Sequence, residues 1–128
     1  MNNALTLVRM RLREYDFHLL WNGKAMLDWN ARGSDTDRIL RNDPEATAAM
    51  LALLGREAAA ASRIYGYDPD EVPDEEALVR YLTALALPWE YRAAVEAIGQ
   101  AIGYGNDQDY KPADDGSVDI DTLELKKN

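Results

Sequence analysis

The fold is decided by residues 43–66, DPEATAAMLALLGREAAAASRIYG, which carry a long helical pattern. Asp43 supplies a capping side chain, and Pro44 fits the first helical position, where its missing N–H costs nothing. From Glu45 to Tyr65 an apolar stripe is expected to face a core, and Gly66 is expected to end the helix. The stripe consists of Thr47, Met50, Leu51, Leu54, Ala58, Ala61 and Tyr65.

Towards the N-terminus, the segment Val8-Arg9-Met10-Arg11-Leu12-Arg13 alternates apolar with basic side chains. This period is typical of a half-buried strand and places the three arginines on one face. A helix through Leu5, Val8 and Leu12 is the alternative.

Asp16 is then expected to cap a helix over residues 17–32, because Phe17, Trp21, Ala25 and Trp29 recur every fourth residue. Gly33 would end that helix. The capping pattern of residues 34–37 predicts a short helical turn around Ile39 and Leu40.

Towards the C-terminus, residues 67–74 hold two prolines and four acidic residues and predict a loop. Asp74 would cap a helix over residues 75–86, and Leu87-Pro88 would break the chain and open a last helix over residues 88–103. Gly103-Tyr104-Gly105 would stop it. The inward side chains would be Leu78, Tyr81, Leu82 and Leu85 on the first of these helices, and Tyr91, Val95, Ile98 and Ile102 on the second.

The remaining residues, 105–128, are polar and acidic and contain few large apolar side chains before Val118. They predict a tail that is mobile when free, although the alternation in Val118-Asp119-Ile120-Asp121 favours docking on a partner. The expected organisation is a helical domain over residues 1–104 and a flexible acidic tail over residues 105–128. The expected fold class is mainly α, with about four helices in a small bundle and a short N-terminal strand.

Composition narrows the classes of function. Cysteine is absent, which excludes disulfide frameworks, thiolate metal sites and cysteine nucleophiles. Of the net charge of −9, residues 1–66 contribute +1, from nine Lys/Arg against eight Asp/Glu, and residues 67–128 contribute −10, from five against fifteen. The acidic second half would repel nucleic acid and anionic membranes. Because no signal-peptide pattern or membrane-spanning run occurs, a soluble intracellular protein is expected.

Motifs for catalysis are missing from the sequence. Neither a GxxxxGK[ST] loop nor a GxGxxG motif occurs, and His18, the one histidine, is expected to be a partly buried helix residue. The acidic residues do not fit the spacing of an EF-hand, so a solvated acidic surface is favoured over a calcium site. Glu90 and Glu96 are expected on a solvated helix face. We therefore expect no catalytic activity, no cofactor and no metal.

The order of features along the chain carries a family resemblance. A basic and apolar strand precedes Tyr15-Asp16-Phe17, and a helix with the run MLALL at residues 50–54 precedes YGYDP at residues 65–69. AAVEAIGQAIGYG follows at residues 93–105 and VDIDTLELKK at residues 118–127. Together these features resemble the tail assembly chaperones of long-tailed bacteriophages and prophages, in their short form.

The resemblance implies a mainly helical protein that self-associates and coats the tape measure protein, keeping it soluble until tail tube protein polymerises around it. It also implies a longer, frameshifted form that recruits tail tube subunits. Such a protein would act in the cytoplasm of the bacterial host and would be absent from the mature virion. Nucleic acid and membrane are not expected partners.

A chaperone of this kind would hold an amphipathic helix in apolar grooves with charged rims, and the helices joined at Leu87-Pro88 would form a hinged pair with such a groove. The alternatives are an acidic inhibitor that mimics nucleic acid, another small adaptor, or a small hydrolase, which would need a buried carboxylate in a pocket. The candidate contact residues are Tyr81, Trp89, Tyr91, Tyr104, Val118 and Ile120.

Overall fold

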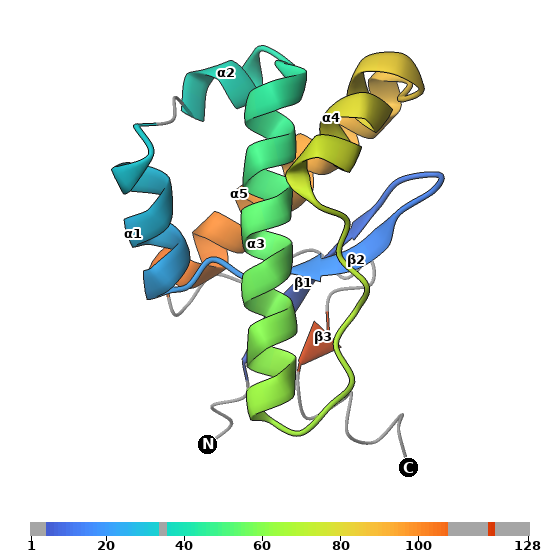
Figure 1. The fold of residues 1–128 in the computed structure, drawn as a ribbon. Coiled ribbons are helices and arrows are strands. Elements are labelled where there is room, and N and C mark those ends of the chain that lie inside the picture. Colours follow the sequence, from blue (N-terminus) through green and yellow to red (C-terminus); the bar gives the residue numbers. More distant parts are fainter. Residues whose placement is uncertain (1–4, 34–35, 108–117, 120–128) are drawn as a thin grey trace.

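The computed structural model describes residues 5–33, 36–107 and 118–119, which form five helices and three strands (Figure 1). The mainly helical character is therefore confirmed. Within these ranges, none of the helices combines the length and apolar character that a membrane span needs. In chain order the elements are β1 (Thr6–Arg11), β2 (Asp16–Leu19), α1 (Gly23–Ala31), α2 (Thr36–Leu40), α3 (Pro44–Ile64), α4 (Glu75–Ala84), α5 (Pro88–Asn106) and β3 (Val118–Asp119).

Helix α3 is the central element and contacts α1, α2, α4, α5 and β2 (Figure 1). It begins as predicted, because the Asp43 side chain accepts a hydrogen bond from the Ala46 N–H at 3.0 Å and Pro44 follows as the first helical residue. The predicted stripe is buried as far as Ala61. Tyr65 is wrong as a stripe residue, because it is the C-cap and its side chain turns outward to 52% exposure.

The predicted helix over residues 17–32 is wrong in its first part. Asp16–Leu19 form strand β2, which pairs antiparallel with β1 and places Val8 opposite Leu19 and Met10 opposite Phe17. These four side chains are buried together on one face of the hairpin. Cross-strand packing of this kind outweighs the helical spacing of the same residues.

Helix α1 instead starts at Gly23. Its N-cap is Asn22, whose side chain accepts a hydrogen bond from the Ala25 N–H at 2.9 Å. The helix ends at Ala31, and Gly33 follows with a φ of 65°, as the predicted stop requires. The predicted stripe therefore combined Phe17 and Trp21, which precede α1, with Ala25 and Trp29, which lie in it.

The hairpin changes the architecture. Because β1 and β2 supply large side chains to the same core as α3, α4 and α5, the molecule consists of helices packed around α3 and a small sheet. A four-helix bundle is not confirmed. The short helix expected around Ile39 and Leu40 is present as α2, and the loop over residues 67–74 is present as well.

The two C-terminal helices end at residues other than those predicted. Helix α4 stops at Ala84, so Leu85 is its C-cap and is 56% exposed; its predicted inward position is wrong. Helix α5 continues to Asn106, past the predicted stop at Gly103. Its last turn packs on the chain before α1, since a Cβ at Gly105 would lie 2.2 Å from the Trp21 carbonyl oxygen. Tertiary contact therefore overrides the weak helix propensity of the glycines.

Strand β3 brings part of the predicted tail onto the sheet. Val118 and Asp119 lie opposite Leu7 and Thr6 of β1, so the strand order is β2-β1-β3. Ile120 lies outside the described residues. The division into a domain over residues 1–104 and a tail over residues 105–128 stays a prediction, although α5 crosses that boundary.

Candidate functional site

Three of the predicted contact residues take part in packing within the chain. Tyr81 is only 4% exposed and belongs to the core. Tyr91 is half-buried, and its hydroxyl donates to the Leu82 carbonyl oxygen at 2.7 Å. Tyr104 is half-buried, and its hydroxyl accepts from the Thr6 N–H at 3.0 Å. Trp89 differs from them, since 43% of its surface is exposed.

Trp89 borders a groove of about 240 Å³ between α5 and β1. On the strand side, Arg9 is paired with Asp16 through Nε at 2.9 Å, and Arg11 lies opposite Asp16 in the hairpin and interacts electrostatically with it. Arg9 and Arg11 thus line the groove together, as predicted for the arginine face. The predicted place of Arg13 on the same strand face is wrong, because β1 ends at Arg11 and the Arg13 side chain bonds to Glu90. The groove is lined by Arg9, Arg11, Trp89, Ala93, Glu96, Ala97 and Gln100.

Apolar residues extend this surface at the junction of α4 and α5. Leu85 and Leu87, which precede Trp89 in the sequence, are 56% and 44% exposed. We call Trp89, Leu85, Leu87 and the groove the Trp89 surface. Exposed apolar side chains with a charged rim are typical of a protein-binding surface.

The junction itself is fixed by Glu90, whose predicted solvated position is wrong because it is fully buried. One carboxylate oxygen accepts from the Arg13 Nε at 2.7 Å and the Leu87 N–H at 2.9 Å. The other accepts from the Arg13 N–H at 3.0 Å and from the Tyr81 hydroxyl. Four donors therefore converge on one carboxylate, which joins the β1–β2 turn to both helices.

Hydrogen bonding decides the charge state of Glu90. Burial alone would raise the pKa of its carboxyl group, but the donors from Tyr81, Leu87 and Arg13 outweigh burial and lower the pKa from 4.5 to about 2. A catalytic acid at neutral pH needs the opposite shift. Glu90 is thus a structural carboxylate and does not fit the general acid of a hydrolase.

This pKa predicts acid sensitivity. Because the folded-state pKa of Glu90 is depressed, its stabilising contribution is complete above pH 4.5 and is lost as the pH falls towards 2. We expect the free energy of unfolding in urea to decrease over that interval. The Glu90→Gln variant should lack the part of the decrease that arises from Glu90, and an identical pH profile in both proteins would contradict the assignment.

His18 lies on β2 rather than on a helix. Its ring Nδ1 and its backbone N–H contact the same oxygen of Asp70, at 2.8 Å and 2.9 Å. The hydrogen bond from the His18 ring lowers the pKa of the Asp70 carboxyl group. The pair fastens the loop over residues 67–74 to the hairpin.

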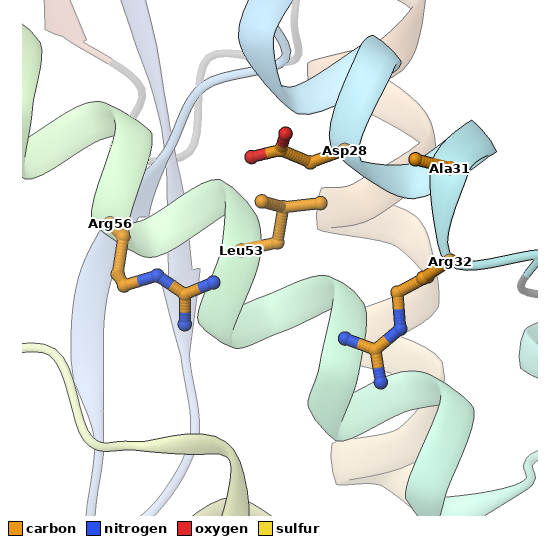
Figure 2. Close-up of a pocket in the computed structure, with 5 residues that line it drawn as sticks. All are labelled: Asp28, Ala31, Arg32, Leu53 and Arg56. Carbon is orange, nitrogen blue, oxygen red and sulfur yellow. The ribbon is translucent and has the colours of Figure 1, made fainter.

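A second cavity, of about 400 Å³, lies between α1 and α3 (Figure 2). It is lined by Asp28, Ala31 and Arg32 from the α1 side and by Leu53 and Arg56 from α3. The sequence did not reveal this pocket, because its residues look like ordinary exposed and core positions of two separate helices.

The burial of Glu90 was also missed, although the sequence carried one signal for it. A glutamate three residues after a helix N-cap often reaches back to the N-cap N–H.

Comparison of the chain with protein-family models, curated proteins and solved structures yields no match. Any inference about function therefore depends on the sequence resemblance together with the groove, the pocket, the exposed apolar residues and the Glu90 cluster.

Proposed function

We propose that this protein is a short-form tail assembly chaperone of a long-tailed bacteriophage or prophage, which self-associates and keeps the tape measure protein soluble during tail tube assembly. The proposal includes a longer frameshifted form that contacts tail tube protein. It places the action in the cytoplasm of the bacterial host and outside the finished virion.

The observation that carries the proposal is the Trp89 surface. A tryptophan with 43% exposure next to two exposed leucines is costly to leave in water, and covering it with a partner side chain would remove that cost. Arg9, Arg11 and Glu96 supply the charged rim that limits non-specific association. A long amphipathic helix matches this combination of an apolar strip and polar edges.

The Glu90 cluster supports the same function. The Arg13 side chain also donates to the Leu85 carbonyl oxygen, and the Tyr91 hydroxyl bonds to Leu82. The α4–α5 junction is thereby held in one arrangement, in contrast to the expected hinge. A preorganised surface loses less entropy on binding than a flexible one.

The test is co-expression with the tape measure protein encoded beside this chain, followed by size-exclusion chromatography with light scattering. A soluble complex, with a tape measure protein that is insoluble alone, would support the proposal. A strictly monomeric chain that leaves the tape measure protein insoluble would overturn it, and the nucleic-acid mimic would become the leading alternative.

We expect Trp89→Ala to weaken the complex by about 30-fold, because a central exposed tryptophan typically contributes about 2 kcal/mol at an interface. The matched control is Tyr65→Ala, which removes another exposed aromatic side chain, 52% exposed, at the end of α3. Affinity can be measured by titrating the purified variants into labelled tape measure fragments. Equal loss in both variants would show that Trp89 has no special role.

A further inference from the structure

The pocket between α1 and α3 presents two guanidinium groups to one space. Figure 2 shows the Arg56 side chain directed toward Leu53, the Asp28 carboxylate near the leucine, and Arg32 on the other side of the pocket with its guanidinium group turned away from Leu53. A volume of about 400 Å³ accommodates one or two side chains of a partner. The pocket is distinct from the Trp89 surface, with which it shares no lining residue.

Some charged side chains of the pocket have partners within the chain and one does not. The two terminal guanidinium nitrogens of Arg32 bond to Glu75 at 3.1 Å. The Lys24 ammonium group donates to Asp28 at 2.8 Å and lies 3.6 Å from a Glu57 carboxylate oxygen. Arg56 has no partner among the described residues, although it lies on the pocket wall. Among the lining residues that the structure describes, the charged group left unpaired is therefore the Arg56 guanidinium. A guanidinium group binds a carboxylate with two parallel hydrogen bonds.

Apolar surface adjoins this charge. Leu27 lies one helical turn before Ala31 on α1 and is 64% exposed, so it flanks the pocket rim. Leu53 adds an apolar side chain to the pocket lining, beside the Arg56 guanidinium group (Figure 2). A ligand that fits must combine a carboxylate with neighbouring apolar groups.

The charge distribution of the whole chain points in the same direction. Both helices of the pocket belong to residues 1–66, which carry +1, whereas residues 67–128 carry −10. An acidic partner segment is repelled by the second half and directed to the first.

We propose that the α1–α3 pocket binds an acidic side chain of an amphipathic helix from a partner protein, with Arg56 pairing the carboxylate and Leu27 covering an adjacent apolar side chain. The inference rests on the proposed protein-binding function and adds a second contact with defined chemistry. The α1–α3 pocket is therefore expected to bind helices rich in leucine and glutamate more tightly than helices rich in leucine and lysine.

The experiment uses the full chain and two short, end-blocked, fluorescein-labelled helical peptides that differ only in carrying glutamate or lysine between the leucines. Fluorescence anisotropy should show at least about tenfold tighter binding of the glutamate peptide, since a charge-assisted hydrogen bond is worth more than about 1.4 kcal/mol. Arg56→Glu should remove this preference. The matched control is Arg63→Glu on the same helix, because Arg63 is exposed, lies outside the pocket and has no partner among the described residues.

Two further variants separate the outcomes. Arg56→Lys keeps the charge but loses the paired hydrogen bonds, so it should bind with intermediate affinity even where Arg56→Glu unfolds. Trp89→Ala should keep the Arg56-dependent preference for the glutamate peptide, measured as the affinity difference between this variant with and without Arg56→Glu, so failure of the tape measure test alone would leave this site intact. Equal affinity for both peptides, unchanged binding by Arg56→Glu, or ready displacement of the peptide by inorganic phosphate would overturn the proposal.

Discussion

Replacing Glu90 with glutamine is expected to lower the free energy of unfolding by about 3 kcal/mol, the typical cost of breaking a buried charged pair. The wild-type carboxylate offers two oxygens to four donors, and glutamine offers one oxygen and an amide group. In either orientation the amide nitrogen faces at least one backbone N–H, from Leu87 or from Arg13, which then has no acceptor. The guanidinium group of Arg13 also loses its counter-charge.

Urea unfolding of purified variants, followed by circular dichroism, measures this loss. Glu96→Gln is the matched control on the same helix, and it should change stability by less than about 0.5 kcal/mol, because Glu96 is exposed and has no partner among the described residues. Tyr81→Phe should lie between the two, since it removes a single donor. A Glu90→Gln variant as stable as the control would show that the cluster contributes nothing.

Local signals were sufficient for the elements whose ends are set by their own residues. Asp43-Pro44 and Asp74 start α3 and α4 through side-chain caps, and Gly33 and Gly66 follow helices with positive φ angles. Each signal acts within one turn of the chain, so the sequence predicts it directly.

Long-range contacts account for the errors. Phe17 lies in a strand because Met10 pairs with it, and α5 extends past Gly103 because its last turn contacts Trp21. Neither partner can be identified from helical or strand periodicity, which describes only one element at a time. The same limit applies to Glu90, whose burial depends on Arg13, separated from it by 77 positions.

In the candidate site, too, local sequence patterns predicted single residues but not the long-range contacts between them. The sequence indicated Trp89 as a candidate contact residue, and it is exposed. The alternation of residues 8–13 predicted that Arg9 and Arg11 share a face. Their meeting across a groove required the packing of α5 on β1. Tyr81 and Tyr91 were predicted as contact residues because of their aromatic character, but that character serves the core equally well.

Replacing Gly55 with leucine is expected to destabilise the protein by about 3 kcal/mol or more, although leucine favours a helix by about 1 kcal/mol over glycine. A Cβ at this position would lie 2.7 Å from the Val72 Cγ1 and 2.8 Å from the Phe17 Cε2. Both side chains belong to segments packed on α3, and the Leu20 N–H bonds to the Leu54 carbonyl oxygen at 3.1 Å beside them. Adding a leucine side chain here forces the hairpin and the loop away from α3.

Gly99→Ala separates this steric cost from the general effect of removing a helical glycine. Gly99 lies on the exposed side of α5 with nothing within 4 Å of the added Cβ, so alanine should stabilise the protein by about 0.5 to 1 kcal/mol. Thermal unfolding should therefore shift in opposite directions for the two variants. If Gly55→Leu raised the unfolding temperature as Gly99→Ala does, α3 would not lie close to Phe17 and Val72, and the packing of the hairpin on the central helix would be refuted.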